Sequence, residues 1–244
     1  MSTDLHAVSI AAHDPALLAR FWAGVLRREV VDGPVGPELL PDGDPGFLIR
    51  FFRSDQDKQG PNQSHFDLTS ASLDDQQAIV DRALGLGGRY LDVGQSPDED
   101  HVVLADPEGN ELCVVGPDNR FLAGTATIGC LSSDGLRDVG VFWSEALGWP
   151  LVWDQDTETA VQSPRGGSKI SWGGDPVNPK LGPNRLHLDL SPGADSDQDT
   201  EVDRLLALGA TRLDPDHPVA LGHGVLPVVV LADPGGNELC VLPS

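Results

Sequence analysis

Residues 104–114 read LADPEGNELCV, and the same stretch returns at residues 231–241 as LADPGGNELCV. The two copies differ at a single position, which is Glu108 in the first copy and Gly235 in the second. Near-identity at two places indicates an internal duplication, in which one structural unit of about 120 residues is used twice.

The rest of the chain repeats in the same order. Residues 58–68 read KQGPNQSHFDL, and residues 180–190 read KLGPNRLHLDL. These two stretches are offset by 122 positions and the LADP stretches by 127, so the second half gains five residues between them. The duplication predicts two domains, residues 1–118 and 126–244, joined by a linker at residues 119–125.

The composition excludes several classes of partner. A formal net charge of −22 over 244 residues would repel nucleic acid and anionic membranes, because phosphate binding depends on clustered Lys and Arg. No apolar run approaches the roughly 18 residues of a membrane helix, and the N-terminus lacks the features of a signal peptide. The three cysteines do not suggest a disulfide framework. We therefore expect an acidic, cytoplasmic protein that binds neither nucleic acid nor membranes.

The periodicity of the chain predicts a strand, a helix and then three strands, in that order, four times. Residues 7–12 alternate as a half-buried strand does, and Asp14-Pro15 supplies a helix cap followed by a proline at the first helical position. A second helix is predicted at residues 74–86, ending at Gly87-Gly88. The four βαβββ modules span about residues 1–60, 61–118, 126–182 and 183–244.

These motifs together resemble the vicinal oxygen chelate superfamily, also called the glyoxalase/bleomycin-resistance/dioxygenase superfamily. The resemblance rests on Asp-Pro followed by a helix with Phe-Trp, on His-x-Asp-Leu, on LALGATRL at residues 206–213, and on the repeated LADPxGNELCV. It implies an α+β fold of two tandem glyoxalase-like domains. In each, two modules would pair into a curved, mostly antiparallel eight-stranded sheet, with helices on the convex side and the ligand on the concave side.

The resemblance also implies a metal site with three ligands, on the first strand of one module and on the first and last strands of the next. At these positions the two halves of this chain carry Ala7 and Thr127, His65 and His187, and Cys113 and Cys240. Only the histidines match the usual ligands, and transition metals need three or four convergent donors. We therefore expect no obligatory cofactor.

A divalent metal remains the alternative expectation. It would be held by His65, Cys113 and His6 in the first half, or by His187 and Cys240 in the second. His6 lies one step from the expected inward position, so strand alternation turns it to the other face unless a bulge restores it.

Glu111 and Glu238 are weak candidates for catalysis. Strand periodicity places each on the same face as the cysteine two residues later, where a carboxylate could act as a general base. The competing interpretation is a solvated carboxylate beside a Gly-Asn turn.

The other candidates are ligand-binding residues, and each has a structural alternative. Near the cysteines, a His and Asp pair could activate a thiolate, but a cysteine between apolar residues is commonly inert core. Lysines could attract an anionic ligand or dock on backbone carbonyls, and tryptophans could line an apolar pocket or fill the core. These candidates are His65, Asp67, Cys113, His187, Asp189, Cys240, Trp153, Trp172, Lys58 and Lys180. Beside the insertion, His217 and His223 could form a lid or be exposed loop residues.

We expect the ligand to be a small organic molecule that is bound or transformed without an obligatory metal. A metal-dependent lyase, isomerase or extradiol-type dioxygenase is one alternative, as the resemblance implies for members that keep the ligands. In a second alternative one half is degenerate and serves only for pairing or for forming a homodimer.

Overall fold

The computed structural model describes residues 3–41, 43, 46–96, 99–224 and 226–244. Within them the chain forms the four predicted modules. The first contains β1 (Asp4–Ala12), α1 (Pro15–Leu26), β2 (Val30–Asp32), β3 (Pro37–Leu39) and β4 (Leu48–Arg53). The second contains β5 (Ser64–Leu68), α2 (Leu73–Gly85), β6 (Arg89–Tyr90), β7 (Val102–Ala105) and β8 (Glu111–Val114).

The second half repeats this order and adds one short helix. The third module contains β9 (Ile128–Ser133), α3 (Arg137–Leu147), β10 (Leu151–Gln155), β11 (Glu158–Ser163) and β12 (Gly166–Trp172). The fourth contains β13 (Leu186–Ser191), α4 (Gln198–Ala207), β14 (Thr211–Arg212), α5 (Pro218–Gly222), β15 (Val229–Ala232) and β16 (Glu238–Val241). Helix α5 was not predicted, and it lies in the segment where the second half is longer.

The helix ends form as the sequence predicts. The Asp14 carboxylate accepts a hydrogen bond from the amide of Leu17 at 2.9 Å, and Pro15 occupies the first helical position of α1. Helix α2 is capped by Ser72, and Gly87 follows its end with a φ of 100°, a conformation that glycine adopts without strain. Local capping therefore fixes where each of these helices lies along the chain.

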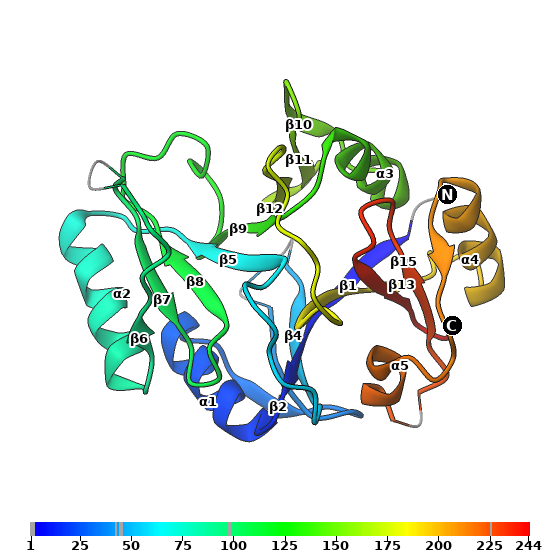
Figure 1. Cartoon of the computed structure of the whole chain (residues 1–244), viewed down its shortest axis with the longest axis horizontal. Helices are drawn as coiled ribbons and strands as arrows, with labels where there is room; N and C mark the ends of the chain where they lie inside the picture. Colours follow the sequence, from blue (N-terminus) through cyan, green and yellow to red (C-terminus); the bar gives the residue numbers. More distant parts are fainter. Residues whose placement is uncertain (1–2, 42, 44–45, 97–98, 225) are drawn as a thin grey trace.

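The sheets combine modules from different halves of the sequence. One sheet has the order β14-β15-β16-β13-β1-β4-β3-β2, so it joins the first and fourth modules. The other has the order β10-β11-β12-β9-β5-β8-β7-β6, so it joins the second and third. Figure 1 shows β1 beside β13 and β5 beside β9. The eight-stranded sheets are as the resemblance implies, but the expected pairing of modules within each half is not observed.

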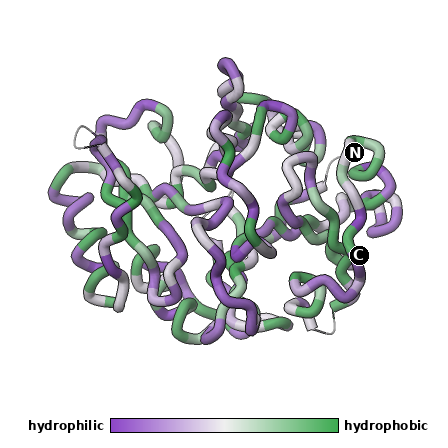
Figure 2. Tube along the Cα trace, viewed as in Figure 1, coloured by the Kyte–Doolittle hydropathy of each residue, from purple (hydrophilic) through white to green (hydrophobic). Residues whose placement is uncertain are grey.

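Contacts between a helix and a hairpin link the two modules of each half. The indole of Trp22 on α1 donates a hydrogen bond to Asp106 in the β7–β8 hairpin at 3.2 Å, and Trp143 donates equivalently to Asp233 at 2.9 Å. Trp22 also packs edge-on against Phe66 of β5. The main hydrophobic core draws on both sheets and on α1 to α4, and Figure 2 shows apolar segments along the strands that supply it.

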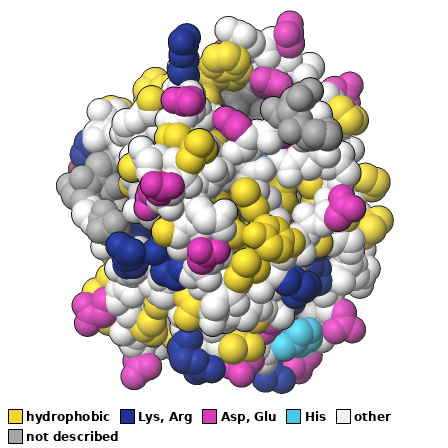
Figure 3. All heavy atoms as spheres, turned by 90° about the vertical axis from the view of Figure 1, so that its left-hand side faces the viewer, with side chains coloured by type: hydrophobic (Ala, Val, Ile, Leu, Met, Phe, Trp, Pro, Cys, Tyr) yellow, Lys and Arg dark blue, Asp and Glu magenta, His cyan; other side chains and the backbone are white. Residues whose placement is uncertain are grey.

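The face of the molecule that carries α2 is mixed in character. Figure 3 shows acidic and basic side chains dispersed among hydrophobic ones on the face that carries α2. Among the described residues, no helix is both long enough and apolar enough to cross a bilayer.

Candidate functional site

The two His-x-Asp strands meet a partner strand at the centre of each sheet. His65 on β5 lies opposite Ser132 on β9, and His187 on β13 lies opposite Ser9 on β1. Side chains alternate along a strand, so each histidine shares one face with the aspartate two residues later.

The last strand of each module adds a cysteine to this face. Cys113 on β8 is in register with Asp67, and Cys240 on β16 is in register with Asp189. We call the face of the β5/β9 sheet that carries His65, Asp67 and Cys113 the β5/β9 cup. The face of the β1/β13 sheet that carries His187, Asp189 and Cys240 is the β1/β13 cup.

In the β5/β9 cup the three groups form a compact and partly exposed cluster. The Nε2 atom of His65 lies 3.3 Å from Oδ1 of Asp67. The hydroxyl of Ser132 donates to Oδ2 of Asp67 at 2.5 Å, and Cys113 is within reach of both. The histidine is a third exposed, at 33%, so a molecule entering from solvent can contact it.

The electrostatics of this cluster favour an ion pair beside a neutral thiol. Burial acts to lower the pKa of His65, but hydrogen bonds with Asp67 and Cys113 outweigh it and raise the pKa well above 6.5. Burial acts to raise the pKa of Asp67, but His65 and Ser132 lower it overall. Burial raises the pKa of the Cys113 thiol. At neutral pH the cluster therefore offers an imidazolium, a carboxylate and a thiol rather than a thiolate nucleophile.

A cavity of about 420 Å³ opens over this cluster. Its walls come from the second and third modules, so the site is built across the two halves of the sequence. Apolar side chains and hydrogen-bonding groups share the lining, which includes Val93, Val103, Asn62, Gln63, Ser133 and Asn178. A cavity of this size suits a small organic molecule.

An aromatic hollow of about 310 Å³ adjoins the cavity, and both are lined by Gly173. Trp153 is 38% exposed there and meets the ring of Phe121 edge-on at 6.3 Å. Lys169 holds Phe121 in place by donating to its carbonyl oxygen and lying over its ring. Trp172 also lines the hollow but is 2% exposed and stacks on Trp143, so it is largely core.

The β1/β13 cup carries charged groups that the other cup lacks. Arg50 on β4 donates to Asp189 and to Glu38, each at 2.7 Å, and Ser9 donates to Asp189 at 2.6 Å. Arg50 is 2% exposed, so this network is buried. Burial acts to raise the pKa of Asp189, but interactions with His187 and the Ser9 hydroxyl lower it to about 2.

Helix α5 closes the β1/β13 cup. His223, which follows the helix, is fully buried, and its Nε2 atom lies 3.1 Å from Nε2 of His187. The ring of Phe52 stacks on His223 at 5.7 Å. The interpretation of His223 as an exposed loop residue is therefore wrong. Burial lowers the pKa of His223 to about 4 and raises that of the Cys240 thiol.

The two candidate glutamates are paired with the two candidate lysines. Lys58 donates to Glu111 at 2.7 Å, and Lys180 donates to Glu238 at 2.6 Å. The Glu238 side chain is 1% exposed and Glu111 only 14%, so the expectation of solvated carboxylates is wrong for both. Lys58 also donates to the carbonyl of Gly60. These pairs secure the loop before each His-x-Asp strand, which leaves the lysines engaged rather than free to attract an anion.

Two other candidates lie on the periphery of the β1/β13 cup. His6 sits at a bulge in β1, where the register shifts between Leu5 and Ala7, and its Nε2 atom is 3.4 Å from the Arg50 guanidinium. It therefore lies in the sheet of His187, away from His65 and Cys113. His217 caps α5 and lies 3.5 Å from Glu238.

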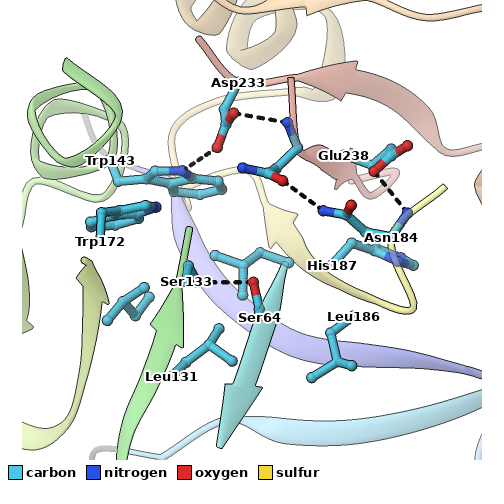
Figure 4. Close-up of a pocket in the computed structure, with 13 residues that line it drawn as sticks. Ser64, Leu131, Ser133, Trp143, Trp172, Asn184, Leu186, His187, Asp233 and Glu238 are labelled. Carbon is cyan, nitrogen blue, oxygen red and sulfur yellow. Dashed lines mark hydrogen bonds between the residues drawn. The ribbon is translucent and has the colours of Figure 1, made fainter. Parts of the chain in front are cut away.

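A small cavity of about 30 Å³ lies where the two halves meet (Figure 4). Ser64 and Ser133 share a hydrogen bond at 2.9 Å on its floor, and Asn184 donates to Asn237 at 2.9 Å across from them. This volume matches a single water molecule rather than an organic ligand. The residues around it position β5, β9 and the β15–β16 hairpin.

A sequence model described as a glyoxalase-like domain matches residues 7–115 and again residues 129–242. A putative dioxygenase from Bacillus subtilis superposes with a TM-score of 0.59 at 16% identity, covering 100% of this chain and 86% of that one. Glyoxalase I from Zea mays superposes with a TM-score of 0.63 at 11% identity, covering 99% and 92%. At these identities the solved structures show the fold alone. No curated protein matches the chain.

Proposed function

The chain belongs to the glyoxalase-like domain family, and from this premise we propose that it binds a small organic molecule in the β5/β9 cup without an obligatory metal ion. The observation that carries the proposal is the contrast between the cups. The β5/β9 cup opens into a cavity of about 420 Å³, whereas His187, Asp189 and Cys240 of the other cup are at most 3% exposed. One cup is thus accessible and the other is closed.

The lining favours a flat, largely apolar molecule that carries hydrogen-bonding groups. Val93 and Val103 supply apolar walls, and Phe121 with Trp153 supplies an aromatic surface next to them. The described residues that line the cavity include no lysine or arginine, and the nearby Lys58 is paired with Glu111, so the lining does not select for an anion. We infer an aromatic or alicyclic ligand whose polar groups reach His65.

The chemistry available at the floor of the cup is proton transfer. His65 is held by Asp67, and Asp67 is fixed in turn by Ser132, so the imidazole has a defined orientation. A raised pKa makes it an acid at neutral pH that could protonate, or donate a hydrogen bond to, a carbonyl or hydroxyl of the ligand. If a transformation occurs, we assign the proton-transfer role to His65.

A metal-dependent lyase, isomerase or dioxygenase is the alternative, and one observation favours it. His65, Asp67 and Cys113 each present a donor atom within 4.8 Å of the others. These residues would hold the ion, which would act as a Lewis acid toward the ligand. Against this, three potential ligands rather than four converge among the described residues of this cup, and the Ser132 hydroxyl already donates to Asp67.

The test is a thermal-shift screen of aromatic and alicyclic compounds on chelator-treated protein, with binding constants then measured by calorimetry. Trp153→Ala should lower the affinity for a stabilising compound about tenfold, because an aromatic contact is lost. Tyr90→Ala is the matched control, because Tyr90 is an exposed aromatic residue on the edge strand β6 of the same sheet.

Two results would contradict the proposal. One is that no compound stabilises the protein. The other is that binding disappears on chelation and that His65→Ala removes a stoichiometric metal ion, which would establish the metal-dependent alternative in this cup.

A further inference from the structure

Four potential metal ligands converge beneath α5 in the closed cup. They are His187, Asp189, His223 and Cys240, and the donor atoms of all four lie within 4.8 Å of one another. His187 and Cys240 occupy the positions that the family resemblance implies. Asp189 and His223 do not, and His223 is supplied by the inserted segment with α5, which the first half lacks.

The spacing of the donors matches a tetrahedral ion. The Nε2 atoms of His187 and His223 are 3.1 Å apart, and they lie 3.3 Å and 3.5 Å from Oδ1 of Asp189. Ligands placed about 2.0–2.1 Å from zinc at tetrahedral angles are separated by about 3.3 Å. The three atoms therefore form one face of a coordination tetrahedron, with Cys240 nearby to complete it.

Three buried side-chain atoms of the cluster lack a hydrogen-bond partner among the described residues, namely Oδ1 of Asp189 and the Nδ1 atoms of His187 and His223. Oδ2 of Asp189 accepts hydrogen bonds from Ser9 and Arg50, but Oδ1, which faces the two imidazoles, accepts none from the described residues. The side chain is fully buried, and an unsatisfied carboxylate oxygen at such a position is costly. A cation between Oδ1 and the two Nε2 atoms would satisfy that oxygen.

The charges of the cup also fit a divalent ion. Arg50 and Glu38 cancel, which leaves the negative charge of Asp189 inside the buried network. A divalent ion bound by neutral histidines and by the Cys240 thiolate contributes a net charge of about +1, which neutralises the cup. A single proton shared by His187 and His223 would balance the charge equally, so the two states must be separated by experiment.

We propose that the β1/β13 cup holds one zinc-type divalent ion between His187, Asp189, His223 and Cys240, and that this ion fixes α5 over the sheet. The role is structural, because all four ligands are buried, at most 3% exposed, and come entirely from the protein. Among the described residues of the β5/β9 cup the equivalent group has three members, all of which lie on β5 or β8. The proposal is independent of ligand binding in that cup.

The test uses the full chain, unfolded with a chelator and refolded with or without one equivalent of Zn²⁺ or Co²⁺. Wild type should retain about one ion per chain by mass spectrometry, and Zn²⁺ in about hundredfold excess over its Kd should raise the Tm by about 5 °C or more. The Co²⁺ form should show tetrahedral absorption with a thiolate charge-transfer band, which Cys240→Ser should remove.

The variants locate the ion. His223→Gln should lose the ion, whereas His65→Gln, the same substitution at the histidine of the open cup, should keep it. Circular dichroism of each refolded variant checks that the fold is intact. If a variant does not refold, the Co²⁺ spectrum of the wild type decides alone, because the shared-proton state gives no tetrahedral or thiolate absorption.

Three outcomes would overturn the proposal. The wild type could refold to the same Tm with and without metal and retain none. The ion could survive in a folded His223→Gln variant, or it could be lost from His65→Gln instead. Ligand binding in the open cup is measured on metal-free protein, so either proposal can fail without the other.

Discussion

The hydroxyl of Ser9 donates a hydrogen bond of 2.6 Å to Asp189, although 180 positions separate the two residues in the sequence. The bond crosses the junction of β1 and β13. Its counterpart in the other sheet joins Ser132 to Asp67 across β9 and β5. Both bonds bridge the two halves of the duplicated chain, so each His-x-Asp strand is completed by a serine from the opposite half.

The first prediction concerns an isolated half. Residues 1–118 contain β1 and β5, whose partners β13 and β9 belong to the other half. An exposed central strand edge must find another strand, so we expect this fragment to unfold or to self-associate. Light scattering after size exclusion checks the mass. A well-folded monomer of the fragment would show that the halves do not need each other.

The second prediction concerns Arg50. Replacing it by alanine leaves Glu38 and Asp189 buried without their cation, which should cost about 3–5 kcal/mol of unfolding free energy. Arg53→Ala is the control, because Arg53 and its partner Asp55 are mostly exposed, and about 0–1 kcal/mol is expected. Urea unfolding of metal-free protein measures both. Equal effects of the two changes would contradict the buried network.

The third prediction concerns the carboxylate at the first hairpin. Oδ1 of Asp106 accepts from two backbone amides, and Oδ2 accepts from Trp22 and from the Asn110 side chain. Asp106→Asn can place an amide NH₂ group, which is a donor, opposite these two side-chain donors. It should lower the free energy of unfolding by about 2–4 kcal/mol. Trp22→Phe removes one donor and some packing, so about 1–2 kcal/mol is expected. Denaturation midpoints measure both changes. An unchanged midpoint for Asp106→Asn would contradict the predicted role of the Asp106 carboxylate.

The fourth prediction concerns pH and His65. Its folded-state pKa is raised above the unfolded value, so its pairing with Asp67 stabilises the fold fully below about pH 6.5. The contribution is lost as the pH rises through the raised pKa. Wild type should therefore exceed His65→Gln in stability by more at pH 6 than at pH 9. Asp67→Asn should abolish this pH dependence, and a constant difference in thermal melts would refute the ion pair.

The modules could be predicted from the sequence because their signals are local. Asp14 and Pro15 fix the start of α1, and alternation identifies the strands. The pairing of modules could not be predicted from such local signals. Strands β1, β5, β9 and β13 all open a module, and the same apolar face is buried whether β1 pairs with β5 or with β13. The connections that decide between them carry no local pattern.

The candidate site was also predicted in part. The repeated motif identified His65 and His187, together with the aspartates and cysteines beside them. Arg50 was missed, although a lone arginine within the apolar run FLIRFF at residues 47–52 was a signal of a buried ion pair. The longer second half pointed to His223, but its burial depends on α5 docking against Phe52, which is a tertiary contact.

The crossed arrangement of the sheets has a consequence for how the two cups can differ. Two identical half-chains that assembled about a twofold axis would be bound by symmetry to present the same pocket twice. Covalent fusion removes that constraint while it preserves the same strand pairing. The β1/β13 cup can then specialise in stabilising the fold, while the β5/β9 cup remains free to evolve toward binding a ligand.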